Sequence, residues 1–495
     1  MTEALALATL GVPLAGALLC ALPAAPRTTA RLSTAAAVVT AGVATALALG
    51  ILIDPVASVP GAWYLADAAA GVFLLVIAVI GLLSALTLPV YLRDARPDLL
   101  AGGGDDRSRR IVHVAFLLFW SALLLVPLAA NLAVAWLLVE STTAASALLV
   151  ASSGRRSALE AGWKYLILTT FGLTFALLGI VVLYAALGDG SGSLHTLDWA
   201  AIHAGAHALD SSTATVVAVL LLAGLAAKAG WAPVHNWLPD AHSEAPPPVS
   251  ALLSAALLPT VVLVAWRVQT ALAPSSAAGL VHALLLGFGL VSLAVAVPFL
   301  WRPMALKRLL AYSSLEHMGV LALGIGFGGP LAIAGVIVHL VGHALAKALG
   351  FTATIPLLAV DPVLARRPAA GLPATSPAAA GAVGLSLATL GGMPPGPLFF
   401  SELLILAGGI ATDHLAVTIA AGALLALGFL GLAHALIEAL AADPPTGRDT
   451  TIVRRRSPRL VALTAGVAVA LAALSAGALA LPHAQLVTRL ARGLS

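Results

Sequence analysis

Residues 330–358 read PLAIAGVIVHLVGHALAKALGFTATIPLL, and the only ionisable side chains in this stretch are His339, His343 and Lys347. A helix that crosses the hydrocarbon core of a bilayer needs about 20 apolar residues, so the stretch predicts a membrane-spanning helix. The rest of the 495-residue chain has the same character, because 60% of it is hydrophobic and only 9% is charged. Soluble domains carry about 25% charged residues. The sequence therefore predicts an all-α polytopic membrane protein.

Apolar stretches of this length recur along the chain and predict about fourteen transmembrane helices. Their ranges are 3–22, 31–53, 68–92, 111–128, 131–152, 162–187, 213–234, 247–271, 279–301, 304–327, 330–358, 377–411, 415–441 and 459–481. The stretch 377–411 is too long for one straight span and contains Met393-Pro394-Pro395-Gly396-Pro397, which predicts a broken helix.

The basic residues predict an orientation. Lys and Arg concentrate in cytoplasmic loops. Most of the 25 Lys and Arg residues lie at alternate connections, namely 27–31, 93–110, 155–164, 302–308, 366–367 and 448–459. We therefore expect a multi-pass protein of the cytoplasmic membrane, in contact with the lipid bilayer, with these loops in the cytoplasm and both termini outside. This asymmetry accounts for the net charge of +4 without any affinity for nucleic acid.

The single cysteine, Cys20, excludes a disulfide framework, a thiolate-held zinc site and a cysteine-ligated iron–sulfur cluster. His235 and Asp240 lie with other polar residues in a short loop before Pro246-Pro247-Pro248, a pattern that could suggest a metal site. We expect no metal there, and no cofactor bound by this chain.

Ionisable side chains inside the predicted spans are the strongest functional signal. Each costs roughly 2.5–3.5 kcal/mol at the centre of a spanning helix, so such residues usually mark an ion or proton path. The predicted path residues are Glu140, Lys228, His339, His343, Lys347 and Glu402, and the predicted accessory residues are Lys307, Glu316, His317, His235 and Asp240. The alternative for any one of them is a structural hydrogen-bond partner or a static counter-ion.

The spacing of these residues supports a path. His339, His343 and Lys347 recur every four residues, so they share one helix face over about 12 Å. Lys228 is followed by Gly230 and Pro233, and Glu402 follows the other predicted break. Paired breaks indicate an inverted-repeat transporter. We therefore predict repeats at 111–271 and 279–441, preceded by a three-helix segment at 1–110 and followed at 442–495 by a cytoplasmic basic loop and a last helix.

Four segments carry a family resemblance: KAGWAPVHNWLPDAHSEAPPPVSALLS (228–254), LKRLLAYSSLEHMG (306–319), HLVGHALAKAL (339–349) and GGMPPGPLFFSELL (391–404). Together they resemble the proton-conducting antiporter-type membrane subunits of respiratory complex I, multisubunit cation/proton antiporters and membrane-bound hydrogenases. The resemblance runs in order from about residue 111 to 441. It implies fourteen helices and two inverted five-helix repeats, each containing a broken helix.

The resemblance also implies residue roles. Glu140 and Lys228 match the family's essential pair, Lys347 its eleventh-helix lysine, and Glu402 the charged residue of its second broken helix. His339 and His343 match the histidines that precede that lysine. Two features depart from complex I. The eighth span offers only hydroxyl residues where many members carry Lys or His, and Glu316-His317 resembles the hydrogenase-4 component F branch.

These features together predict a non-catalytic, proton-translocating subunit of a redox-driven complex, like hydrogenase-4, formate hydrogenlyase or NADH-quinone oxidoreductase, with other membrane subunits as partners. Glu140 would set the charge of Lys228, and His339, His343 and Lys347 would relay the proton to Glu402 for release outside. The identity of the translocated ion, proton or sodium, is left open. The alternatives are a subunit of a cation/proton antiporter or inorganic-carbon uptake complex without redox chemistry, and a non-conducting scaffold for a peripheral enzyme.

Overall fold

The computed structural model describes residues 2–54, 63–94, 106–188, 192–360, 364, 366–442 and 458–479. Within these ranges the chain is helical and forms no β-strand. The first helices are α1 (Thr2–Ala21), α2 (Pro26–Ile53), α3 (Ala68–Asp94), α4 (Asp106–Leu125), α5 (Leu132–Val150), α6 (Arg156–Leu187), α7 (Trp199–Gly205), α8 (Ser211–Ala229) and α9 (Trp237–Glu244). They are followed by α10 (Pro247–Leu252), the π-helix η7 (Leu253–Leu257), α11 (Leu258–Leu272), α12 (Ala278–Leu300), α13 (Leu306–Phe327), α14 (Gly329–Val360), α15 (Leu372–Thr375), α16 (Pro377–Leu390), α17 (Pro397–Ala411), α18 (Leu415–Ala441) and α19 (Pro458–Leu479).

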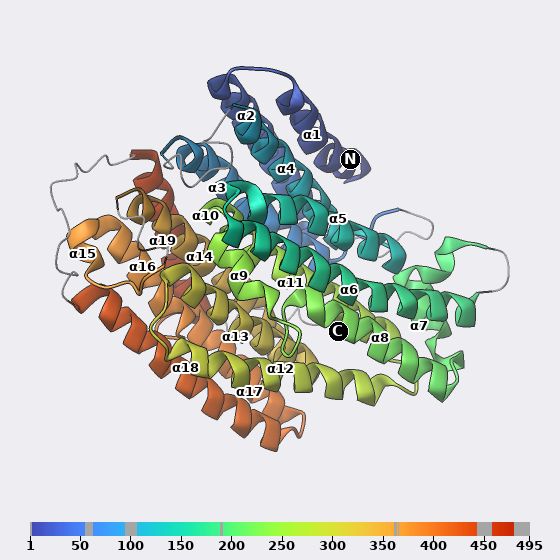
Figure 1. Cartoon of the computed structure of the whole chain (residues 1–495). Coiled ribbons are helices and arrows are strands. Elements are labelled where there is room, and N and C mark those ends of the chain that lie inside the picture. The colour runs from blue at the N-terminus through green and yellow to red at the C-terminus, as the bar shows by residue number, and fades with distance from the viewer. Residues whose placement is uncertain are drawn as a thin grey trace.

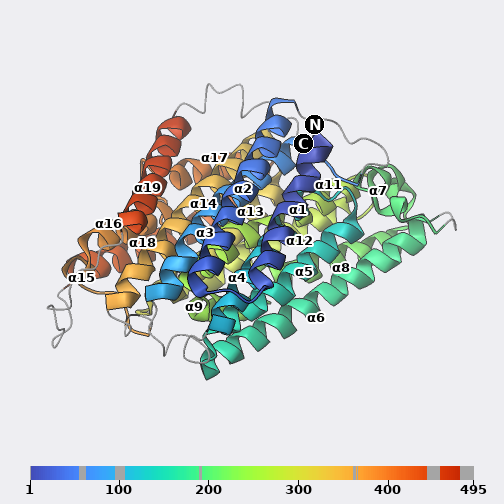
Figure 2. The same ribbon diagram turned by 90° about the horizontal axis from the view of Figure 1, so that it is seen from above.

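The helices form a bundle with α13 and α14 in its middle. Figures 1 and 2 both place α6 and α8 at one edge and α16 and α18 at the opposite edge. Burial follows this order, because α13 and the continuous segment Pro247–Leu272 are buried along their length, whereas α18 is largely exposed. Helix α13, which carries Lys307, Glu316 and His317, is therefore among the helices most withdrawn from lipid.

Twelve helices within the described ranges are long and apolar enough to cross a membrane. The predicted span 377–411 is instead two shorter apolar helices, α16 and α17, which confirms the predicted break. Helix α19 lies at the predicted last span. The count of fourteen and the division into two repeats stay predictions, and so does the basic loop before α19, since residues 443–457 lie outside the described part of the chain.

The first broken helix is interrupted at Gly230, one of the residues that the sequence marks as a break. Helix α8 ends at Ala229, since Gly230 adopts a left-handed conformation with φ of 73°. At membrane depth a broken backbone must find partners inside the protein. Trp231 Nε1 donates to the Met318 carbonyl at 2.8 Å, and the Ala232 amide donates to Ser292 Oγ at 3.0 Å. The break is therefore built into the contacts with α12 and α13.

The second broken helix is also interrupted at a glycine with a left-handed backbone. Helix α16 ends at Leu390, Gly392 has a φ of 71°, and α17 begins at Pro397, whose fixed φ suits a first helical position. The Met393 amide donates to the Ala388 carbonyl at 3.0 Å, so the turn satisfies part of its own backbone. Glu402 lies one turn into α17.

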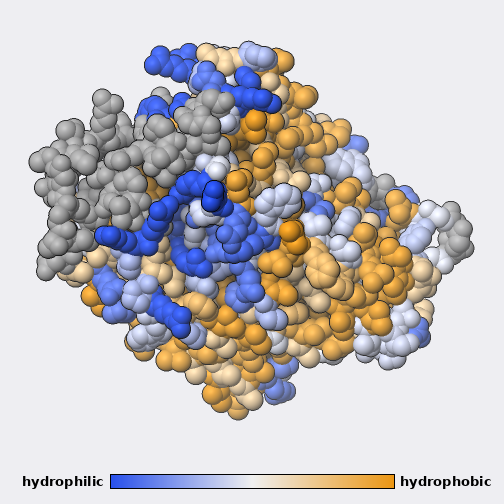
Figure 3. Space-filling view, in the orientation of Figure 1, coloured by the Kyte–Doolittle hydropathy of each residue, from blue (hydrophilic) through white to orange (hydrophobic). Residues whose placement is uncertain are grey.

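Much of the visible surface is apolar. Large side chains of α6 such as Trp163, Ile167 and Phe171 are exposed, as expected of a face turned to lipid or to a neighbouring subunit. Figure 3 shows hydrophobic residues over much of this face, a hydrophilic patch over α9 and smaller hydrophilic areas nearer the edges. This polar patch over α9 contains ion pairs of Asp240 with Lys164 and with Arg308.

Candidate functional site

Lys228 is fully buried at the end of α8 and is held by hydroxyl groups. Its Nζ donates to Thr143 Oγ1 at 2.7 Å and to Tyr165 Oη at 2.6 Å, and it lies 4.6 Å from the centre of the Tyr165 ring. Ser146 Oγ is 2.7 Å from the same tyrosine oxygen. Hydroxyl groups of α5 and α6 therefore stabilise the ammonium group of Lys228, which lipid could not do. These hydrogen bonds lower the free-energy cost of burying it.

Glu140 lies near Lys228 without touching it. The half-buried carboxylate accepts a hydrogen bond from Thr170 Oγ1 at 2.8 Å and a longer one from Thr143 Oγ1 at 3.5 Å. The two charged groups form no direct ion pair, and the Thr143 hydroxyl links them instead. A proton or a charge change on Glu140 is thus felt at Lys228 through one hydroxyl.

Lys347 is the corresponding buried lysine on α14. Its Nζ donates to the Leu310 carbonyl at 2.6 Å and to Ser313 Oγ, both on α13. Like Lys228, it has no carboxylate within ion-pair distance in the described structure. Unlike Lys228, its charge is felt by a fully buried carboxylate, Glu316.

The histidines form a cluster between α13 and α14, with His317 as its third member. His317 Nδ1 and His339 Nε2 are 3.1 Å apart, and His339 Nδ1 is 2.9 Å from Ser401 Oγ of α17. The His343 ring centre lies 5.2 Å from that of His317. Both ring nitrogens of His343 are buried without a hydrogen-bond partner among the described residues. The α14 face predicted from spacing is therefore real, and α13 completes it.

Two carboxylates adjoin this histidine cluster. Glu316 is buried on α13, and its Oε1 is close to the backbone of α18, since a Cβ added at Gly428 would lie 2.0 Å from it. Glu402 is half-buried and lies against the second break, where a Cβ at Gly392 would be 2.8 Å from its Oε2. Glu316 was predicted as accessory, and it directly precedes His317 on α13.

The eighth span carries no Lys or His, but one of its hydroxyl groups contacts α13. Its backbone forms the π-helix η7, and π-turns occur frequently at functional sites. Ser254, inside η7, is 2.7 Å from Ser314 Oγ of α13, next to the Ser313 that holds Lys347. His242 of α9 adds a buried imidazole that stacks on Phe351 of α14.

The other predicted accessory residues lie away from this chain of groups. Lys307 donates to the Ser243 carbonyl at 2.8 Å and to that of Ala245, so it holds the end of α9. Asp240 makes the surface ion pairs of the polar patch. His235 is half-buried, and its Nδ1 has no partner among the described residues. Lys307 and Asp240 thus hold elements in place.

Sequence reasoning missed the Lys228 ligands Thr143 and Tyr165, the Ser146 hydroxyl that contacts Tyr165, and the contact between Ser254 and Ser314. Thr and Ser are common in spanning helices, so composition gives them no signal. Helical spacing does give one, because Thr143 is three residues from Glu140 and therefore on the same face.

A family profile described as NADH:quinone oxidoreductase/Mrp antiporter, transmembrane, matches residues 129–428. The chain belongs to that family. A hydrogenase-4 component F homolog from Methylacidiphilum infernorum is 31% identical over 376 residues, which are 75% of this chain and 78% of the relative. The chain spans about half the length of several other curated relatives that it matches.

Solved structures confirm the fold expected for the family. A chain in the structure of an archaeal respiratory membrane complex, the membrane-bound sulfane sulfur reductase, gives a TM-score of 0.84 at 19% identity, with 99% of this chain and 97% of that chain covered. A chain of the Mrp complex from Dietzia sp. DQ12-45-1b gives 0.81 at 20% identity, covering 100% and 97%. Both neighbours are subunits of multisubunit membrane complexes.

Proposed function

We propose that this chain is a proton-translocating subunit of a redox-driven complex in the cytoplasmic membrane, with its basic loops in the cytoplasm and both termini outside. One observation carries the proposal: His317 and His339 share a hydrogen bond, a carboxylate oxygen of Glu402 lies within 4.8 Å of both, and the buried Lys347 follows His339 by about two turns of α14. Ionisable groups at such depth are costly unless they serve transport.

The route begins at Lys228. A change at Glu140, relayed by Thr143, alters how firmly Lys228 holds its proton. The proton then moves along the Ser254–Ser314 contact, with water or His242 completing the link, to Lys347.

From Lys347 the route continues through imidazole and carboxylate groups. His343 has both ring nitrogens buried without a hydrogen-bond partner among the described residues, and His317 and His339 already share one hydrogen bond. Glu316 and Glu402 accept the proton beyond them, and Glu402, the least buried of the set, releases it on the outer side. Repulsion and attraction between neighbouring charges couple the steps.

The redox partner is supported by the relatives. The component F homolog carries a hydrogenase name, and the archaeal neighbour belongs to a respiratory sulfane sulfur reductase complex. We assign the redox chemistry to partner subunits and no cofactor to this chain.

The second candidate is a subunit of a cation/proton antiporter or inorganic-carbon uptake complex, and the Mrp neighbour favours it. Sodium transport belongs to that candidate. Purification in mild detergent separates the two: iron–sulfur or hydrogenase subunits accompany the chain in the first case, and antiporter subunits or a peripheral zinc protein in the second. A non-conducting scaffold is the third candidate, and retained charges at Glu140, Lys228 and Lys347 argue against it.

The direct test is proton pumping by the purified complex in liposomes. Lys228→Ala and Glu140→Ala should each abolish pumping while the complex assembles normally. Glu160→Ala is the matched control, because that carboxylate lies on α6, is exposed and pairs with Lys164 outside the route. Pumping that survives both substitutions contradicts the proposal.

A further inference from the structure

His317, His339 and Glu402 bring three donors from three helices to one point in the membrane interior. One ligand atom from each lies within 4.8 Å of the other two. Both histidines are almost completely buried, and the carboxylate is half-buried. Because the three residues are far apart in the sequence, no local sequence motif could predict this arrangement.

The separations suit a small transition-metal ion. For three atoms no more than 4.8 Å apart, some point lies within about 2.8 Å of all three, and zinc needs about 2.0–2.2 Å. The His317 Nδ1 to His339 Nε2 distance, 3.1 Å, is already close to the edge of a tetrahedron around zinc. Side-chain shifts of under about 1 Å therefore complete a His₂–carboxylate set.

The surroundings also fit a bound cation. Ser401 Oγ, 2.9 Å from His339 Nδ1, fixes that ring so that Nε2 points towards His317, as outer-shell hydrogen bonds do in zinc sites. The Glu402 carboxylate brings a negative charge to the ion, which offsets part of the cost of placing a cation in a dry site.

From this geometry we propose that His317, His339 and Glu402 form an inhibitory site for Zn²⁺ or a similar imidazole-binding divalent ion. Two imidazoles favour zinc and cobalt over magnesium or calcium. The ion enters past Glu402, the most accessible donor, and displaces the proton shared by the two histidines. This site differs from the polar loop at His235 and Asp240, where the sequence suggested a metal only to reject it.

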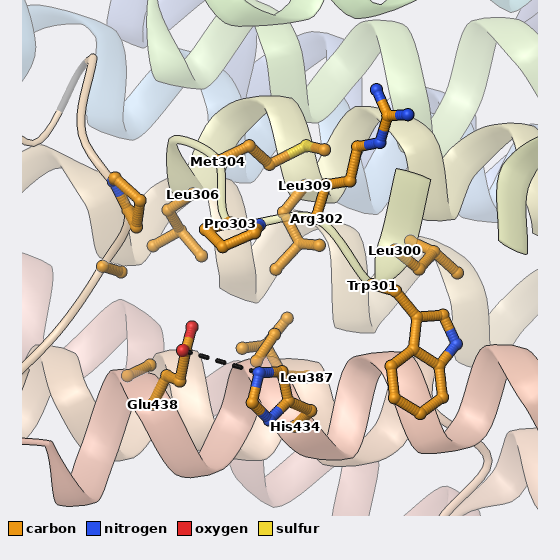
Figure 4. Close-up of a pocket in the computed structure, with 14 residues that line it drawn as sticks. Leu300, Trp301, Arg302, Pro303, Met304, Leu306, Leu309, Leu387, His434 and Glu438 are labelled. Atoms are coloured by element: carbon orange, nitrogen blue, oxygen red, sulfur yellow. Dashed lines mark ion pairs between the residues drawn. The ribbon is translucent and has the colours of Figure 1, made fainter. Parts of the chain in front are cut away.

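The inhibitory role rests on the proposed function, since the ion occupies the last part of the proton route. Metal binding itself does not, and it can be measured without any transport. A surface site must be excluded first, and the chain offers one. His434 and Glu438 lie one turn apart on the exposed face of α18, 3.5 Å apart, at the edge of a small hollow below Arg302 (Figure 4).

The experiment uses the full-length chain in lipid nanodiscs, loaded with Zn²⁺, desalted and assayed for retained zinc. Wild type and the surface control His434→Gln should each retain one equivalent. His317→Gln and Glu402→Gln should retain less than a tenth of that. Co²⁺ loading should give a tetrahedral visible spectrum in the first two proteins only. Gel filtration confirms that each variant is folded.

Equal zinc retention in wild type and in the two site variants overturns the site, as does loss of binding in His434→Gln alone. Proton flux in liposomes then tests the role. Zn²⁺ should inhibit wild type at least tenfold more strongly than a conducting Glu402→Asp variant. Binding of zinc by a protein that carries no proton flux supports the metal site and contradicts the proposed function.

Discussion

The two buried lysines of this protein are solvated in different ways. Lys228 has two hydroxyl ligands and an aromatic face, and its carboxylate partner is half-exposed and one hydroxyl away. Lys347 has one carbonyl and one hydroxyl, and it faces a region where Glu316 Oε2 and both His343 nitrogens lack partners among the described residues.

The difference suggests distinct tasks. Buried polar groups without protein partners are usually satisfied by water. The Lys347 side of the bundle therefore has the open hydrogen-bonding capacity that a water-assisted relay requires. The Lys228 side is nearly saturated, which suits a group that holds a proton until Glu140 changes its surroundings.

After the abolition of pumping expected for Lys228→Ala and Glu140→Ala, the next largest effect should come from Lys347→Ala. The substitution removes a relay group, and a positioned proton carrier contributes about 10²–10⁴-fold to transfer rates. Proton flux in liposomes should fall by about two orders of magnitude or more. Lys307→Ala is the control, because that buried lysine holds the end of α9 instead. It should lower thermal stability and spare most of the flux. An equal loss of proton flux in Lys347→Ala and Lys307→Ala would contradict different roles for the two lysines.

Gly428→Ala, on α18, should disturb the packing of Glu316 on the Lys347 side of the bundle. The added methyl group would lie 2.0 Å from Glu316 Oε1, so the carboxylate or the helix must move. Overpacking of this kind costs about 1–3 kcal/mol, and the thermal midpoint and the flux should both fall. Gly422→Ala on the same helix is the matched control, because the atom nearest to the added methyl group would be 3.8 Å away. An unchanged flux in Gly428→Ala would place Glu316 outside the route.

Ser254→Ala tests the link between the two sides. It removes the hydroxyl that contacts Ser314 at 2.7 Å, and one such bond is worth about 0.5–1.5 kcal/mol, or about twofold to tenfold in rate. Flux should fall within that range. Thr260→Val should have no effect, because the Thr260 hydroxyl donates to the Ala256 carbonyl of its own helix. The idea fails if the two variants behave alike.

Thr143→Val should have the smallest effect. It removes one of two hydroxyl ligands of Lys228, and water reaching the half-exposed Glu140 can replace part of what is lost. We expect flux to fall about twofold to fourfold, with Thr143→Ser restoring it. A loss as large as that of Lys347→Ala would show that the saturated side depends on this one hydroxyl.

Much of the architecture could be predicted from the sequence. Long apolar stretches give the spans, and Gly230 and the Pro394–Pro397 segment mark the breaks. The helical spacing of His339, His343 and Lys347 gives their shared face. These features are local, so a single sequence is enough to find them.

The contacts between helices could not be predicted in the same way. Glu316 and His317 gained their place only when α13 packed against α14 and α17, and Ser254 gained its place from a local change in helical winding. The influence of Glu140 on Lys228 was expected from the sequence, but not that the Thr143 hydroxyl would link the two side chains. Hydroxyl residues carry little signal of their own, since their partners lie on other helices.

The π-helix at Leu253–Leu257 also constrains how this helix can change length. A π-turn accommodates one residue more than the α-turn that it replaces. Deleting one residue there would restore regular α-helix, whereas deleting one elsewhere would rotate the following side chains by about 100°. The segment between Pro247 and Leu272 therefore tolerates a one-residue deletion at this turn alone without losing register, at the cost of the Ser254 contact.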